Sequence, residues 1–278
     1  MTGEVRVLVR GAGDLATGVA HRLHRSGFSV FMTELPEPAA VRRSVAFSQC
    51  VFEGSFTVEG IEAVRAESSG EALELAKDGA RVPVIVDPGE RPLVELSPVV
   101  LVDGRMAKRN LDTSRHQARV VIGLGPGFSA GQDVHAVVET MRGHHLGRVI
   151  YQGQAQPHTG VPAEVGGSGA ERLLRAPSAG TWRTHARLGE HVTQGQLVAE
   201  VWAMSPAGHD VRAQVLAAVP GMLRGLLRDG APVRAGQKAG DIDPRPDPGS
   251  IWLISDKARA VGGGVLEAIC CLLWGRLP

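Results

Sequence analysis

Two glycine-rich loops hold the residues of this chain whose types and spacing could do chemistry. In the first loop, Gly11, Gly13 and Ala16 have the G-x-G-x-x-A spacing of loops that bind the pyrophosphate of a dinucleotide. Gly11 permits a tight turn, Gly13 lets the backbone approach phosphates, and Ala16 lets a helix pack closely on a strand. Glu34 follows at about the separation where an acidic side chain binds a ribose hydroxyl. This pattern predicts a nucleotide site, with a ligand-free structural turn as the alternative.

The second loop, between residues 123 and 131, could form another anion site. Its glycines free backbone N–H groups to form an anion-binding nest. Pro126 has no N–H, and no Gly-Lys-Ser/Thr sequence occurs, so the loop differs from a dinucleotide fingerprint and from a P-loop. A sharp turn before a helix is the alternative. The predicted cofactor-binding residues of the two loops are Gly11, Gly13, Asp14, Leu15, Ala16, Glu34, Gly123, Gly125 and Gly127.

Charged side chains follow several predicted strands and could add to such a site. Glu34, Asp87 and Asp103 could hold Mg²⁺ together, although the two aspartates also suit turns. Two basic clusters could contact anionic substrate groups or simply lie at helix ends. The clusters are Lys108, Arg109 and Asn110, and Arg142, His144, His145 and Arg148. No metal-binding or nucleophile motif occurs, so we assign no metal ligand and no catalytic residue.

These loops need strands and helices to position them. The first loop lies between a strand at 5–9 and an amphipathic helix at 15–25, with a strand at 28–32 beyond it. Continuous β-branched runs at 82–86, 99–102 and 120–122 predict strands of a buried parallel sheet. A strand at 50–52 and helices at 69–77 and 132–141 complete the prediction. The fold class is therefore α/β, a Rossmann-like doubly wound sheet over residues 1–150.

The second half contains an internal repeat. Residues 180–201 align with 221–242 at an offset of 41 residues, including Gly189 with Gly230 and Gly195 with Gly236. Two such units predict a small all-β barrel over 176–243, resembling the biotinyl/lipoyl (barrel-sandwich hybrid) fold. The turn between the repeats has Met204-Ser205 where a carrier presents lysine. We therefore expect no covalent biotin or lipoate.

The remaining segments connect these domains. Residues 151–175 form a connection, and 244–278 contain a Pro/Asp/Gly linker, a strand at 251–254 and a helix at 265–274. Ser255 is the predicted helix N-cap. Because a strand and helix follow the barrel, we expect the C-terminal segment to pack on the first domain, so that the barrel is an insertion.

Composition limits the classes of function. A net charge of +1 argues against nucleic acid as a partner, because phosphate binding needs a basic face. The chain start lacks a leader pattern, and the apolar run at 265–274 is too short to span a bilayer. Cys50, Cys270 and Cys271 suit buried, inert thiols rather than a disulfide framework. These features predict a cytoplasmic protein with no membrane partner.

Five motifs spread over nearly the whole chain carry a resemblance. They are Arg10-Gly-Ala-Gly-Asp-Leu-Ala-Thr-Gly18, Ile122-Gly-Leu-Gly-Pro-Gly-Phe128, Arg142-Gly-His-His-Leu-Gly-Arg148, Gly240-Asp-Ile-Asp-Pro244, and Ile254-Ser-Asp-Lys-Ala258 with Gly262-Gly-Gly-Val-Leu-Glu267. Together they resemble the YqeB-type accessory family of selenium-dependent molybdenum hydroxylases, whose N-terminal part looks like the Rossmann part of XdhC-type chaperones. This chain has His158-Thr-Gly where the family pattern has Asn-Thr-Gly.

The resemblance implies an accessory or maturation protein for molybdenum hydroxylases that binds a nucleotide-bearing cofactor. The implied cofactor is a molybdopterin dinucleotide, NAD(P) or FAD, and the implied partner is a molybdenum hydroxylase or its maturation machinery. Two alternatives stay open: an NAD(P)-dependent oxidoreductase acting on a small molecule, and a non-catalytic scaffold with a vestigial nucleotide site. Whether the protein forms a homo-oligomer is also left open.

Overall fold

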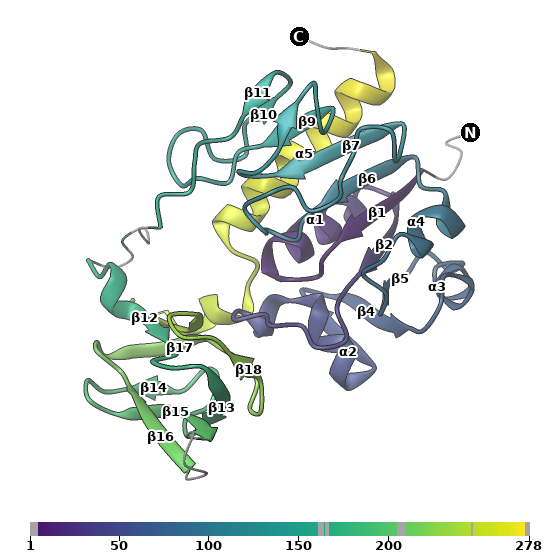
Figure 1. The fold of residues 1–278 in the computed structure, drawn as a ribbon. Coiled ribbons are helices and arrows are strands. Elements are labelled where there is room, and N and C mark those ends of the chain that lie inside the picture. The colour runs from purple at the N-terminus through teal and green to yellow at the C-terminus, as the bar shows by residue number, and fades with distance from the viewer. Residues whose placement is uncertain (1–4, 161–163, 165–166, 205–209, 246, 276–278) are drawn as a thin grey trace. The chain divides into compact units, whose positions relative to one another are not determined.

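The computed structural model describes residues 5–160, 164, 167–204, 210–245 and 247–275, and it forms two compact units (Figure 1). The first unit comprises Met1–Pro38, Val45–Thr159 and Ile254–Pro278. The second comprises Ala39–Ser44 and Gly160–Leu253. The first unit is thus assembled from three separate stretches of chain.

A nine-stranded sheet forms the centre of the first unit, in the order β10-β9-β7-β6-β1-β2-β5-β4-β3. All neighbouring strands from β9 to β4 are parallel, and antiparallel β10 and β3 form the two edges. Its strands are β1 (Arg6–Arg10), β2 (Ser29–Thr33), β3 (Ser55–Val58), β4 (Ile61–Ala66), β5 (Arg81–Ile85), β6 (Val100–Asp103), β7 (Val120–Leu124), β9 (Ala136–Val138) and β10 (Val149–Ile150). A separate short pair joins β8 (Ser129–Ala130) to β11 (Gly153–Gln154).

Helices cover both faces of this sheet. The helices are α1 (Asp14–Arg25), α2 (Cys50–Glu53), α3 (Ser69–Leu75), α4 (Arg91–Leu96) and α5 (Asp256–Trp274). Side chains of α1 and α5 share one apolar core with Val7 and Val9. Side chains of α3 and α4 share another core with Leu8 on the opposite face. Because successive strand residues point to opposite faces, β1 is buried on both sides.

Glycines set the close approach of α1 to α5. A Cβ atom at Gly18 would lie 2.7 Å from the Cβ of Ala258, and one at Gly262 would lie 2.9 Å from the carbonyl oxygen of Gly18. A Cβ atom at Gly264 would overlap the carbonyl oxygen of Gly147, in the turn between β9 and β10. Small residues therefore allow α5 to contact both α1 and that turn at backbone distance.

The second unit contains two four-stranded sheets, whose strands pair antiparallel and enclose a core centred on Trp182. One sheet has the order β12 (Leu173–Arg175), β19 (Lys238–Asp243), β17 (Gly221–Leu226) and β14 (His191–Val192). The other has the order β16 (Asp210–Leu216), β15 (Leu197–Met204), β13 (Gly180–Thr184) and β18 (Pro232–Val233).

The sequence repeat has a structural counterpart in this unit. Strands β13, β14 and β15 occupy the first repeat, and β17, β18 and β19 occupy the second. Strand β13 pairs with β18, and β17 pairs with β14, so each repeat completes a sheet of the other. Gly189 and Gly230 have matching φ angles of +86° and +82°, which favour glycine. Neither repeat forms its sheet alone.

Several predicted elements are confirmed. The helix predicted at 15–25 is α1, the helix at 69–77 is α3, and the strands at 82–86, 99–102 and 120–122 are β5, β6 and β7. Ser255 is the N-cap of α5, where its hydroxyl accepts a hydrogen bond from the Ala258 N–H at 3.1 Å.

Three predicted elements are wrong. Residues 132–141 form turns and β9 rather than a helix, because β-branched Val137 and Val138 are buried within the sheet. Residues 50–52 lie in α2 rather than a strand, since a short apolar run fits either element. The strand predicted at 251–254 is largely a 3₁₀ turn, η4 (Pro248–Trp252), which begins at a proline.

The predicted fold class, a Rossmann-like doubly wound sheet with an inserted biotinyl/lipoyl-like barrel, is also wrong. The large sheet is mixed, because hairpins at both edges add antiparallel β3 and β10. The second unit has two four-stranded sheets instead of one closed barrel. The turn at 205–209, which includes Ser205 of the Met204-Ser205 pair, lies outside the described residues. Within the described chain, no helix has both the length and the apolar character needed to cross a membrane.

Candidate functional site

The carboxyl ends of the parallel strands carry most of the predicted site residues. The first glycine loop follows β1, and Gly11 has a φ of +86°. A Cβ atom at Gly11 would lie 3.2 Å from the Cα of Arg105. The Glu34 carboxylate turns back onto this loop, accepting hydrogen bonds from the N–H groups of Ala12 at 2.7 Å and Leu35 at 2.8 Å. The Glu34 carboxylate therefore accepts hydrogen bonds from the backbone around it rather than facing a ligand.

The other predicted residues of this loop have packing roles or face open space. Leu15 and Ala16 are buried in the core beside α5. A Cβ atom at Gly104 would lie 3.0 Å from the Cβ of Ala16, so a small residue is needed there. Asp14 lies in the first turn of α1, where a carboxylate favours the helix dipole. Gly13 is the N-cap of α1, and a Cβ atom there would meet nothing within 4 Å.

Glu34 gives a pH-dependence prediction. Burial raises the pKa of Glu34 above its ordinary value of 4.5, while the hydrogen bonds from Leu35 and Ala12 oppose this rise. Between the ordinary and the raised pKa, the folded state binds more protons than the unfolded state. The free energy of unfolding should therefore be greatest below the ordinary pKa and fall as pH rises through the raised one.

Urea unfolding of wild type and Glu34→Gln, between about pH 4.5 and 7.5, measures this dependence. The variant should lack the part of the decline that Glu34 causes, whereas the exposed Glu37→Gln serves as the charge-matched control. Parallel stability curves for wild type and Glu34→Gln would contradict the prediction.

The second glycine loop is shaped by packing. Gly123 lies against the Phe128 ring, and the space beside Gly125 is filled by the Thr140 side chain. The Gly125 N–H donates to the carbonyl of Val138 at 2.9 Å. A Cβ atom at Gly127 would lie 2.6 Å from the Cα of Arg109. Each of the three glycines thus admits a neighbouring group at close range.

Both glycine loops contact the long segment 104–119, through Arg105 and Arg109, respectively. No helix or strand forms between β6 and β7, and connections of this length are commonly functional. Met106 and Lys108 have φ angles of +56° and +62°, which are uncommon for residues with side chains. The Lys108 Nζ lies 2.7 Å from the Nε2 of His158.

An ionic cluster fixes this segment to the sheet. Asp103, at the end of β6, is 2% exposed and contacts the Arg105 Nη2 at 2.6 Å. Arg10, at the end of β1, is also 2% exposed and contacts Asp112 at 3.0 Å. Thr113 joins the two, accepting from the Arg10 Nη1 at 2.9 Å and donating to Asp103 at 2.7 Å. The possibility that Glu34, Asp87 and Asp103 hold Mg²⁺ together finds no support, since the carboxylate of Asp103 pairs with Arg105 and that of Glu34 accepts from the Ala12 N–H.

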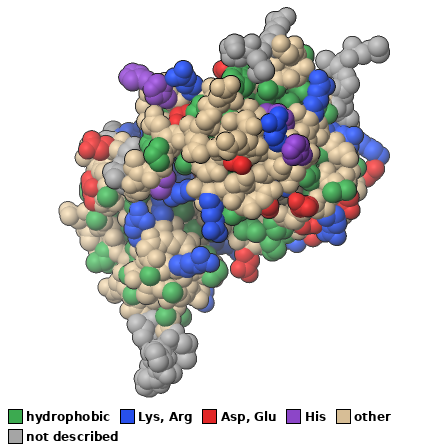
Figure 2. Space-filling view, turned by 45° about the horizontal axis from the view of Figure 1, so that its top comes forward, with side chains coloured by type: hydrophobic (Ala, Val, Ile, Leu, Met, Phe, Trp, Pro, Cys, Tyr) green, Lys and Arg blue, Asp and Glu red, His purple; other side chains and the backbone are tan. Residues whose placement is uncertain are grey.

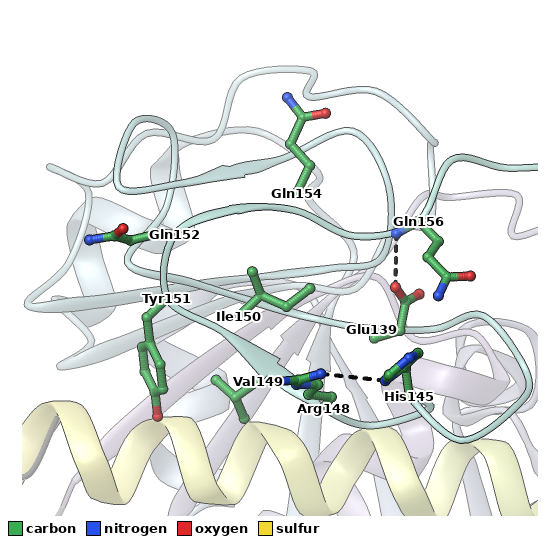
Figure 3. A pocket seen from close by; sticks show the side chains of 9 residues that line it. All are labelled: Glu139, His145, Arg148, Val149, Ile150, Tyr151, Gln152, Gln154 and Gln156. Carbon is green, nitrogen blue, oxygen red and sulfur yellow. Dashed lines mark hydrogen bonds between the residues drawn. The ribbon is translucent and has the colours of Figure 1, made fainter. Parts of the chain in front are cut away.

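A pocket of about 380 Å³ lies along the exposed edge of β10 (Figure 3). Its volume falls in the range of small-molecule sites, roughly 300–1,000 Å³. His145 and Arg148 come from the turn before β10, and polar side chains of the following segment lie across from them. The lining residues are Glu139, His145, Arg148, Val149, Ile150, Tyr151, Gln152, Gln154 and Gln156.

The acid of this pocket is already fully engaged. Glu139 is 2% exposed, and its Oε1 accepts hydrogen bonds from the N–H groups of Thr140 and Met141, both at 2.7 Å. Its Oε2 accepts from the Gln156 N–H at 2.8 Å. The carboxylate therefore ties β9 to the segment that closes the pocket.

The cationic side of the pocket is open. The Arg148 Nη1 lies 3.5 Å from the Nδ1 of His145, and Figure 3 shows the two side chains together near Glu139. Both side chains are exposed, and Arg148 contacts no carboxylate among the residues that the structure describes. Gln154 donates to the Ser129 hydroxyl at 2.7 Å, which fixes its amide. The pocket thus offers a guanidinium, an imidazole and amides.

The sequence-predicted clusters are divided by the structure. His145 and Arg148 line the pocket, whereas Arg142 pairs with Asp256 at 2.7 Å. Tyr151, at the other end of the pocket, points toward α5 (Figure 3). Its pKa is raised, mainly by burial and to a smaller extent by the neighbouring Cys271. Sequence reasoning missed Gln152, Gln154 and Gln156, although their alternation every second residue was a visible signal.

Cysteines and metal-binding groups add no further site. Cys50 is buried as expected, and burial raises its pKa to about 12, whereas Cys270 and Cys271 are only half-buried. In the described ranges, no group of three His, Cys, Asp or Glu side chains is placed to hold a metal ion. Both acidic and basic side chains occur on the face shown in Figure 2.

The first unit is thus an α/β unit with a polar pocket beside its antiparallel edge strand β10. No family model matches the chain. The chain is 48% identical over 272 residues to a protein of Escherichia coli (strain K12) named "Uncharacterized protein YqeB". The match covers 98% of this chain and 48% of that protein, so the chain spans about half the length of the curated relative it matches.

Solved structures give weaker matches. Product-bound EutE (DoeB), an ectoine utilization protein from Ruegeria pomeroyi, matches 86% of this chain with 85% of its own, at 10% identity and a TM-score of 0.28. An aspartoacylase family protein from Mesorhizobium loti matches 86% with 84%, at 9% identity and 0.28. A Silicibacter succinylglutamate desuccinylase matches 86% with 85%, at 16% identity and 0.26. Similarity at this level transfers no activity to this chain.

The predicted function, a molybdenum hydroxylase accessory protein with a Rossmann-type nucleotide site, is corrected by the geometry of the two loops. The Ala12 N–H donates to the Glu34 carboxylate that was predicted to bind a ribose, and Arg105, Thr140 and Arg109 fill the space beside Gly11, Gly125 and Gly127. The solved structures described above bear other names, those of desuccinylase- and aspartoacylase-like proteins. The predicted absence of covalent biotin or lipoate stays a prediction.

Proposed function

We propose that the first unit binds a small anionic molecule in the pocket beside β10. The observation that carries this proposal is that one pocket holds both an open guanidinium, that of Arg148, and a Glu139 carboxylate whose oxygens already accept hydrogen bonds from three backbone N–H groups. An anionic ligand could therefore bind the Arg148 guanidinium without having to displace a carboxylate from it. Arginine suits this role, since its planar fork binds carboxylate or phosphate through two hydrogen bonds.

The remaining polar lining supports a ligand with further hydrogen-bonding groups. The amides of Gln152 and Gln154 offer donors and acceptors across the pocket from Arg148 (Figure 3). Val149 and Ile150 add apolar surface between these polar groups. A pocket with few polar groups on an apolar floor is typical of small-molecule sites.

Calorimetric titration with mono-, di- and tricarboxylates and with phosphate monoesters tests this proposal. We expect one class to bind wild type, and Arg148→Met to weaken that binding at least about 10-fold, which is about 1.4 kcal/mol. Arg142→Met is the matched control, because Arg142 pairs with Asp256 outside the pocket lining. Equal binding by wild type and Arg148→Met, or no binding of any class by wild type, would overturn it.

A further inference from the structure

Two arginines at the carboxyl edge of the sheet grip one carboxylate. The Oδ1 of Asp112 accepts from the Arg10 Nη1 at 3.0 Å and from the Arg105 Nη2 at 2.6 Å. Its Oδ2 accepts from the Arg105 Nη1 at 3.2 Å. We name Arg10 and Arg105 the arginine clamp. This arrangement is the one that proteins use to bind carboxylate or phosphate groups of ligands.

Neighbouring side chains hold both arginines in place independently of Asp112. Asp103 accepts from the Arg105 Nε at 3.1 Å and from its Nη2 at 2.6 Å. The Thr113 hydroxyl accepts from the Arg10 Nη1 at 2.9 Å and from the Arg105 Nη2 at 3.1 Å. The clamp is therefore pre-organised, which lowers the entropic cost of binding a ligand.

The clamp has one donor group to spare. Arg10 is 2% exposed, and its Nη2 is buried with no hydrogen-bond partner among the described residues. A buried guanidinium nitrogen without a partner costs free energy that an incoming acceptor would recover. The carboxylate of Asp112 has only two oxygens, and both already accept from the clamp. A tetrahedral oxyanion brings more acceptor oxygens to the same place.

Asp112 is much more exposed than the residues around it, so its side chain can swing away from the arginine clamp. Its side chain is 46% exposed, against 3% for Arg10 and 2% for Asp103. It belongs to the segment 104–119, which contains no helix or strand. With Asp112 displaced, two guanidiniums face one nearby carboxylate, Asp103, and Glu90 attracts Arg10 more weakly.

We propose that Asp112 occupies the place of a phosphoryl group, and that a phosphate-bearing ligand binds the arginine clamp by displacing it. The clamp shares no residue with the lining of the β10 pocket, so this inference is independent of the proposed function. Asp112 then acts as an internal competitor that keeps the clamp closed to weak anions.

Titration of the full chain with inorganic phosphate tests this inference. Asp112→Ala should bind phosphate at least about 10-fold more tightly than wild type, since it removes the competing carboxylate. Asp229→Ala is the matched control, because Asp229 is an exposed acid that pairs with Arg183 at 3.2 Å in the second unit. That variant should bind phosphate as wild type does.

Two further measurements fix the location and the chemistry. Adding Arg105→Met to Asp112→Ala should abolish the gain, whereas adding Arg142→Met, at an arginine that belongs to neither the clamp nor the β10 pocket, should leave it unchanged. A crystal structure of Asp112→Ala grown with phosphate should show the ion on Arg10 and Arg105. Unchanged phosphate affinity in folded Asp112→Ala would overturn the inference, as would an equal gain for acetate, which has no third oxygen.

Discussion

Gly264→Ala is expected to destabilise the protein by about 3 kcal/mol or more, a large loss for so small a change. A Cβ atom at this position would overlap the Gly147 carbonyl oxygen and lie 2.9 Å from a methyl group of Val138. Gly147 has a φ of +83° and is itself confined, because a Cβ there would lie 2.6 Å from the Ala260 carbonyl. Helix α5 must therefore move away from the sheet.

The adjacent Gly263 provides the control. A Cβ atom at Gly263 would meet nothing within 4 Å, so alanine there should stabilise α5 by about 0.5–1 kcal/mol through its higher helix propensity. Urea unfolding of the two single variants measures both effects. If Gly264→Ala is as stable as Gly263→Ala, the close packing of α5 on the 139–148 turn is wrong.

Glu139→Ala is expected to cost roughly 3–5 kcal/mol of stability. Three backbone N–H groups, those of Thr140, Met141 and Gln156, lose a charged acceptor at 2.7–2.8 Å. The loss should also release the segment around Gln156 that closes the pocket. Unfolding measurements give the stability, and hydrogen exchange at these three amides reports the local release.

Glu139→Gln separates the two oxygens of this carboxylate. Its amide oxygen can still accept from Thr140 and Met141, but its NH₂ group meets the donor N–H of Gln156. We expect an intermediate stability and faster exchange at Gln156 alone. Equal loss in Glu139→Gln and Glu139→Ala would show that hydrogen bonding by the first oxygen contributes little.

Sequence patterns predicted the elements whose burial is simple. The β-branched runs of β5, β6 and β7 identified the buried strands, and the apolar period of α1 identified its core face. The edge strands were harder, because their pairing depends on hairpin partners rather than on local propensity. Residues 136–138 have too short an apolar run to separate a strand from a helix.

The sequence identified several residues of the candidate site but not what their side chains or backbone contact. The glycines at 11 and 125 were noticed as ligand-binding features, yet the groups that require them, Arg105 and Thr140, come from other parts of the chain. Glu34 was expected to face a ribose, and local sequence could not show that the Ala12 N–H would take its carboxylate instead. For His145 and Arg148 the sequence left two interpretations open, contact with an anion or a position at a helix end, and in the structure both line the pocket.

The three-part assembly of the first unit fixes an order of events during synthesis. Val261, Val265 and Ile269 of α5 are fully buried in the core of the first unit, yet the ribosome makes them after residues 160–253. The strands described for the second unit are therefore synthesised before α5, which together with α1 covers one face of the first unit's sheet. A released chain that lacks residues 254–278 would expose the part of this face that α5 otherwise covers, and a protease should degrade its first unit faster than its second.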